Sequence, residues 1–138
     1  MRIFPKVEFI PETEDGDIFR LLEPVKFVWN GKEFTVPAGF TCDGASIPAF
    51  LWASVSPRID TRTLAGSIGH DWLYRNTPEG WTRKDADEFF YDTIRDHGLS
   101  WRKAQKAYWG VRIFGGIAWN RNKNEQQQEE EEGTKNVH

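Results

Sequence analysis

Between residues 60 and 119 the sequence carries three apolar patterns of helical period, separated by short breaks. In each pattern, large apolar side chains recur at every third or fourth position, which is the spacing of one face of an α-helix. The first helix is expected at residues 61–75, the second between Thr82 and Gly98, and the third from Ser100 onward. Because short connections make consecutive helices antiparallel neighbours, this region predicts a compact three-helix core.

The segment before the helices has the alternating apolar pattern and the turn residues of β-strands. Strands are expected at residues 3–10, 18–22, 25–29 and 33–36. Asn30 and Gly31 separate the last two strands, and Asn-Gly is the strongest short-range signal for a β-hairpin. The sequence therefore predicts an α+β fold, in which an N-terminal β-hairpin or small antiparallel sheet is followed by the three-helix core.

The last part of the chain, residues 120–138, consists almost entirely of polar residues, with Asn, Gln and Glu predominating. Such a composition buries too little apolar surface to offset the entropy lost on ordering. A disordered acidic tail is therefore expected at residues 120–138, and residues 1–119 are expected to form a single α+β domain.

The charge of the chain argues against nucleic-acid binding. The formal net charge is −3, and the polar tail holds three basic against five acidic residues. The rest of the chain is therefore close to neutral, without the basic stripe that phosphate recognition requires. Nowhere does the sequence contain the roughly 20 consecutive apolar residues of a transmembrane helix. With Cys42 as its single cysteine and no signal-peptide pattern, the chain is expected in a reducing cytoplasm.

A histidine, an aspartate and a tyrosine stand close together in the first expected helix, as His70, Asp71 and Tyr74. His70 and Tyr74 are four residues apart and therefore share one helical face. On the next, antiparallel helix, Asp87 or Asp85 lies within reach of the imidazole. A carboxylate bound to one ring nitrogen fixes the tautomer and leaves the other nitrogen basic toward a water or hydroxyl. The candidate catalytic residues are therefore His70, Asp87 and Tyr74.

The loop between the strands and the helices is a candidate metal site, since it contains Gly39, Asp43 and Gly44 between two prolines. Glycines in an irregular segment allow backbone carbonyls to turn inward, and calcium takes carboxylate and carbonyl oxygens as ligands. Together with Asp71, these residues predict a calcium site. A cation there would stabilise the oxyanion that develops when water attacks an ester.

Each of these features also has a plain structural explanation. A His-Asp pair near the end of a helix often serves in capping and salt bridges, and Asp71 is expected to pair with Arg75. The glycine-containing loop is explained equally well as a simple turn. His97 is expected to interact with the C-terminal end of its helix, and Cys42 to be a small buried hydrophobe. Gly110, Gly115 and Gly116, inside the third helix, are expected to mark the close approach of another backbone.

The order of the motifs resembles one sequence family. The motifs are Phe34-x-Val36-Pro37-x-Gly39-Phe40-x-x-Asp43-Gly44-Ala45-Ser46-Ile47-Pro48, His70-Asp71-x-Leu73-Tyr74, Ala86-Asp87-x-x-Phe90-Tyr91 and Tyr108-x-x-Val111-Arg112-x-Phe114-Gly115. They are similar, over about residues 25–119, to the phage and prophage family called Domain of Unknown Function 1353. The resemblance implies a phage or prophage protein, in the cytoplasm of the infected bacterium or associated with the virion, and implies no activity.

The helical part also resembles the active-site core of phospholipase A2 enzymes, especially the compact form carried by parvovirus capsids. Those enzymes have a His-Asp-x-x-Tyr helix followed by an antiparallel helix with Ala-Asp-x-x-Phe, matched here from His70 to Tyr74 and around Asp87. The resemblance implies that His70 is the general base and that Asp87 orients it. It also implies that Tyr74 completes the network and that Asp71 binds calcium. The chain departs from the pattern by lacking disulfides and the Tyr-Gly-x-Gly type of calcium loop.

Three functions are consistent with these residues. The leading hypothesis is a small phage-encoded hydrolase, similar to a calcium-dependent phospholipase A2 and acting on a phospholipid ester. The second is a hydrolase that uses the same cluster to degrade peptidoglycan of the cell envelope during phage lysis or entry. The third is a non-enzymatic phage structural protein or host-interaction protein, in which the cluster is a buried polar brace and the partner is a virion or host protein.

Overall fold

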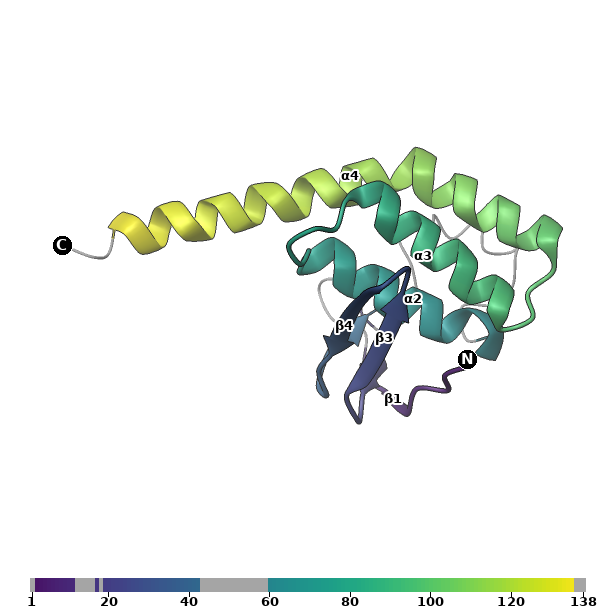
Figure 1. Cartoon of the computed structure of the whole chain (residues 1–138). Helices are drawn as coiled ribbons and strands as arrows, with labels where there is room; N and C mark the ends of the chain where they lie inside the picture. Colours follow the sequence, from purple (N-terminus) through teal and green to yellow (C-terminus); the bar gives the residue numbers. More distant parts are fainter. Residues whose placement is uncertain (1, 12–16, 18, 43–59, 136–138) are drawn as a thin grey trace.

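The computed structural model describes residues 2–11, 17, 19–42 and 60–135. These residues form two small antiparallel sheets followed by three helices, which confirms the predicted α+β fold (Figure 1). The strands are β1 (Val7–Phe9), β2 (Phe19–Leu21), β3 (Val25–Trp29), β4 (Lys32–Val36) and β5 (Thr41–Cys42). The helices are α2 (Thr61–Arg75), α3 (Arg83–Asp96) and α4 (Trp101–Lys135).

The predicted hairpin is confirmed as the two-stranded sheet β3-β4, in which Val25 pairs with Val36. Its turn residues Asn30 and Gly31 have φ angles of 49° and 75°, the left-handed values that a two-residue hairpin turn requires. The other sheet has the order β1-β2-β5. Strands β1 and β2 are shorter than predicted, and β5 lies where a loop was expected. Pro5 lies just before β1, and a proline has no N–H with which to extend the ladder of hydrogen bonds.

The three predicted helices are present, and local caps set where they begin. Asp60 Oδ1 accepts a 2.8 Å hydrogen bond from the backbone N–H of Arg62 at the start of α2. Thr82 and Asp85 form a reciprocal capping box at the start of α3, in which each residue satisfies a backbone N–H of the other. Among the helices of the described chain, none has an apolar stretch that would let it cross a membrane.

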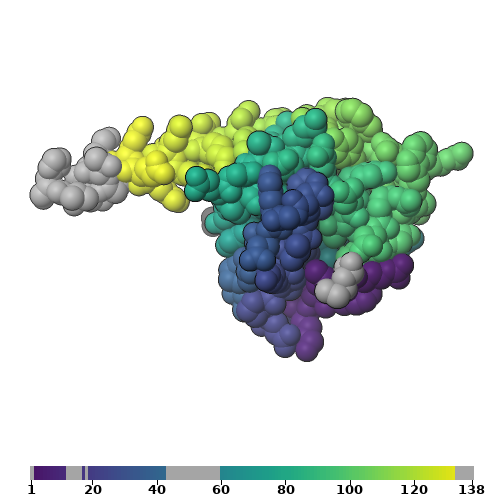
Figure 2. Space-filling view, viewed as in Figure 1, coloured from purple at the N-terminus to yellow at the C-terminus, as the bar shows by residue number. Residues whose placement is uncertain are grey.

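Helix α4 continues to Lys135, through most of the segment that the sequence predicts to be a disordered tail. Its extension docks on the last turn of α2, whose carbonyl groups have no partner within their own helix. Asn122 Nδ2 donates to the carbonyl oxygen of Tyr74 at 3.4 Å, and Gln126 Nε2 donates to that of Arg75 at 2.6 Å. Because Gln and Glu are good helix formers, a polar composition is compatible with a helix that projects beyond the rest of the molecule (Figure 2).

The core lies where the β3-β4 hairpin packs on α2 and α3. Phe27 and Phe34 stack with ring centroids 5.1 Å apart, and each meets Phe89 edge-on at 5.3 Å. Helix α2 approaches α3 closely at Gly69, where an added β carbon would lie 2.6 Å from the Phe89 ring. The close approach positions the next residue, His70, against α3.

Candidate active site

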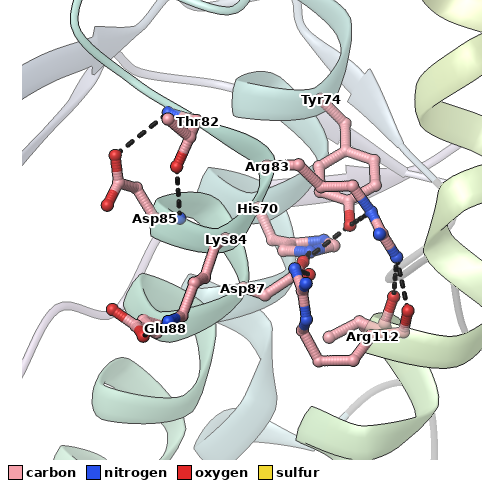
Figure 3. A network of polar contacts seen from close by, with 10 residues as sticks. His70, Tyr74, Thr82, Arg83, Lys84, Asp85, Asp87, Glu88 and Arg112 are labelled. Carbon is pink, nitrogen blue, oxygen red and sulfur yellow. Dashed lines mark hydrogen bonds and ion pairs between the residues drawn. The ribbon is translucent and has the colours of Figure 1, made fainter.

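Three helices bring polar side chains together around Asp87 of α3 (Figure 3). Asp87 Oδ1 lies 2.7 Å from His70 Nε2 and accepts a 2.6 Å hydrogen bond from the Tyr74 hydroxyl. The other carboxylate oxygen, Oδ2, accepts a 2.9 Å hydrogen bond from Arg112 Nη1 of α4. His70, Tyr74 and Asp87 are each 0% exposed. We call His70, Tyr74, Asp87 and Arg112 the Asp87 centre.

The protonation state of Asp87 fixes the tautomer of His70. Burial raises the pKa of the Asp87 carboxyl, but the hydrogen bonds from His70, Tyr74 and Arg112 outweigh burial and hold this pKa below its ordinary value of 3.8. Asp87 is therefore a carboxylate at neutral pH and has no proton to donate. In the 2.7 Å contact the proton must belong to His70 Nε2. A neutral imidazole in this tautomer carries its basic lone pair on Nδ1.

His70 Nδ1 is buried and has no hydrogen-bond partner among the residues that the structure describes. The same holds for Ser67 Oγ, three residues earlier on α2. Residues three apart on a helix are neighbours, so these two polar atoms come from the same side of α2. Since buried polar groups are nearly always hydrogen-bonded, a water molecule or another polar group is expected to bind each of these two atoms.

Arg83 and Gly115 complete the surroundings of the Asp87 centre. Arg83 Nε lies 3.3 Å from the Tyr74 hydroxyl, and its Nη2 donates to the carbonyl oxygen of Arg112 at 2.6 Å. A β carbon at Gly115 would lie 2.6 Å from the same hydroxyl. What approaches Gly115 is thus the Tyr74 side chain, and the prediction of a neighbouring backbone is wrong. Neither Arg83 nor Arg112 was predicted as a site residue, although Arg112 and Gly115 stand together in one of the family motifs.

The predicted calcium ligands are only partly within the described residues, since Asp43 and Gly44 lie outside them. Asp71 Oδ2 lies 3.2 Å from Arg75 Nη2, which confirms the predicted ion pair. The same guanidinium group donates to Asp17 Oδ1 at 2.9 Å. Arg75 therefore occupies a position between two carboxylates, one of which was predicted to bind the metal.

This arrangement does not fit a calcium ion at the described residues. A guanidinium beside Asp71 repels a second cation. Gly39, with φ of 89°, donates its N–H to the carbonyl oxygen of Leu21 at 2.7 Å and so belongs to a turn. Over residues 2–11, 17, 19–42 and 60–135, no group of three or more His, Cys, Asp or Glu side chains is placed to hold a metal ion. The calcium site stays a prediction that depends on Asp43 and Gly44.

The remaining candidate residues have structural roles. His97 Nδ1 lies 2.8 Å from the carbonyl oxygen of Thr93, and its Nε2 accepts a 2.9 Å hydrogen bond from the N–H of Ile3. His97 therefore serves the C-terminal end of α3, as predicted, and also attaches the N-terminal segment to it. Cys42 is 1% exposed, in agreement with a small buried hydrophobe.

Fold and site together define an α+β protein with a buried histidine–aspartate centre shared by two antiparallel helices and closed by a third. The chain belongs to the family described as Protein of unknown function (DUF1353), whose model matches residues 19–111. This finding confirms the family resemblance seen in the motifs. The matched span includes His70, Tyr74 and Asp87 and ends one residue before Arg112.

Two curated relatives are proteins of Sinorhizobium fredii. Uncharacterized protein y4jT is 33% identical over 86 residues, which are 62% of this chain and 25% of that protein. Uncharacterized protein y4iH is 33% identical over 73 residues, which are 53% of this chain and 30% of that protein. The similarity to this chain thus spans between a quarter and a third of the length of each relative. No solved structure matches the chain.

Proposed function

We propose that the protein is a small hydrolase in which His70 acts as the general base. The observation that carries this proposal is the imidazole itself, with Nε2 bound to the Asp87 carboxylate and Nδ1 buried without a partner among the described residues. Nδ1 takes a proton from a water molecule as the water oxygen attacks an ester carbonyl. The bond to the leaving oxygen then breaks, and the imidazolium returns its proton to that oxygen, which yields a carboxylic acid and an alcohol.

Asp87, Tyr74 and Arg112 are positioning residues in this proposal. Asp87 holds the ring and stabilises the positive charge that the imidazole acquires. Burial, together with the negative charge of Asp87, raises the pKa of the Tyr74 phenol, so Tyr74 remains a protonated donor. Arg112 binds the second oxygen of Asp87 and favours its charged form. Because three donors fix the carboxylate, the imidazole is held in one orientation.

The proposed substrate is a phospholipid ester, and its support is the resemblance of the helix pair to phospholipase A2. The proposed mechanism contains no step that uses calcium, because Asp71 already pairs with the Arg75 guanidinium. Peptidoglycan remains the alternative substrate for the same base. A phage origin, and a location in the host cytoplasm or the virion, belong to the same proposal and are supported by the motif resemblance alone.

The burial of the Asp87 centre supports a second candidate function, in which the centre is a structural brace. His70, Tyr74 and Asp87 are all 0% exposed, which is what a buried polar brace in a non-enzymatic phage structural or host-interaction protein requires. For the hydrolase, the same burial means that the residues covering His70 must move before a substrate reaches Nδ1. The two candidates therefore differ in whether the chain has any hydrolytic activity at all.

A panel of substrates separates these functions. The wild-type chain is incubated with a soluble fatty-acid ester, with phospholipid vesicles and with purified peptidoglycan, each with calcium and with a chelator, and the released products are measured. The hydrolase proposal predicts release of fatty acid. Release of peptidoglycan fragments alone would favour the envelope-degrading alternative. No product from any substrate, together with a His70→Ala variant destabilised by about 1–3 kcal/mol, would favour the brace.

A further inference from the structure

The exposed side of α4 carries a row of apolar side chains that the Asp87 centre does not use. Trp109, Ile113 and Ile117 are 56%, 68% and 75% exposed. They are spaced four residues apart and therefore form one stripe along the helix. The core-facing residues Ala107 and Val111 are 0% exposed. Helix α4 thus has one apolar face in the core and a second one in solvent, which we call the α4 row.

Basic residues surround the α4 row. Residues 101–121 contain five basic residues and no acidic residue. Of these, Arg102 and Lys106 are exposed before the row and Arg121 is exposed after it. Although the net charge of the domain is close to neutral, the charge along this part of α4 is therefore entirely basic. In Figure 1, α4 lies along the outer edge of the helical layer, with α3 beneath it.

We propose that this face of α4 binds the surface of an anionic phospholipid membrane. The α4 row would enter the boundary between headgroups and acyl chains, and Arg102, Lys106 and Arg121 would contact lipid phosphates. A helix with an apolar stripe and basic flanks is the pattern of proteins that lie on membranes. The amphipathic ring of Trp109 favours this boundary.

The combination of basic and apolar side chains on this face favours an anionic membrane over other partners. A nucleic acid would pair with the basic residues but would leave three large apolar side chains in water. An uncharged lipid surface would accept the α4 row but leave the basic residues without partners. This inference goes beyond the proposed hydrolysis and does not depend on it, since a protein with a purely structural Asp87 centre has the same face.

The test is co-sedimentation of the full chain with vesicles of phosphatidylcholine alone and of phosphatidylcholine mixed with phosphatidylglycerol. We expect binding to the mixed vesicles that weakens as salt is raised. The variant Ile113→Ser/Ile117→Ser should lose at least about 10-fold in partitioning for each side chain. The variant Arg102→Gln/Lys106→Gln should lose roughly 30-fold on mixed vesicles.

Matched controls come from residues of the β3-β4 hairpin, which do not belong to the α4 row. Val28 on β3 is 69% exposed, as exposed as Ile113, and Val28→Ser should bind like the wild type. Lys26→Gln is the corresponding control for charge. His70→Asn should also bind vesicles normally, so a failure of hydrolysis and a failure of membrane binding are distinguishable.

Three results would overturn the proposal. One is absence of wild-type binding to the mixed vesicles, and another is equal binding to both kinds of vesicle. The third is binding that survives Ile113→Ser/Ile117→Ser. If vesicle binding is absent and the chain instead forms a dimer that this variant dissociates, the α4 row is an interface between copies.

Discussion

Gly115 of α4 and Tyr74 of α2 meet so closely that a β carbon on the glycine would lie 2.6 Å from the tyrosine hydroxyl. The same hydroxyl donates a 2.6 Å hydrogen bond to Asp87. The Tyr74 hydroxyl can therefore donate to Asp87 from this position only because residue 115 of α4 has no β carbon.

Gly115→Ala should destabilise the protein by about 1–3 kcal/mol, because the new methyl group overpacks the contact with Tyr74. The matched control is Gly116→Ala on the next position of α4. There a β carbon would come no closer than 3.7 Å to the Arg83 guanidinium, so the gain in helix propensity should leave stability unchanged or raised by up to about 1 kcal/mol. Urea unfolding of both variants checks this, and equal effects would contradict the proposed close contact.

Asp87 should make stability depend on pH in the acid range. Its pKa in the folded state lies below the ordinary value of 3.8. As pH falls, the unfolded chain therefore binds the proton first, and the stabilisation by Asp87 is complete above about pH 4 and lost as pH falls through the folded pKa. Asp87→Asn should cost about 3 kcal/mol at pH 7. Its difference from the wild type should shrink below pH 4 in urea titrations, and a constant difference would contradict this account.

The extension of α4 should stabilise the end of α2. A chain ending at residue 119 loses the bonds from Asn122 and Gln126 to the carbonyls of α2, which should cost about 1–3 kcal/mol. A chain ending at residue 129 keeps these bonds and is the control. Hydrogen exchange at the last turn of α2 reports the effect locally. Equal stability and exchange in the two shortened chains would show that the docking contributes nothing.

Calcium should bind poorly, because Arg75 already pairs with Asp71 at 3.2 Å. Isothermal titration of the wild type is expected to show no saturable binding at calcium concentrations up to the millimolar range. Saturable binding that disappears in Asp71→Asn would contradict this expectation. It would also show that Asp71 takes part in a calcium site.

The parts of the fold that local sequence determines were predictable. Asn30-Gly31 sets the hairpin, and Asp60 and Thr82 set the first residues of α2 and α3. The pairing of His70 with Asp87 was also predictable, since the short break between α2 and α3 makes the two helices antiparallel neighbours.

Long-range contacts of α4 were not predictable from these patterns. Arg112 lies 25 residues after Asp87 in the chain. It reaches Asp87 only because α4 packs over α2 and α3. The helix after residue 119 is explained by its partners on α2, and composition alone indicates disorder there. In both cases the deciding interaction lies between segments that are distant in sequence.

The most direct test of the central claim is the rate of ester hydrolysis by His70→Asn, compared with the wild type and with His97→Asn. Both histidines are buried, but only His70 belongs to the Asp87 centre, so His97→Asn controls for the loss of a buried imidazole. A general base contributes roughly 100-fold to 10,000-fold to the rate. We predict a loss of that size for folded His70→Asn and near wild-type rates for folded His97→Asn. Equal rates in all three proteins would contradict the assignment of His70 as the base.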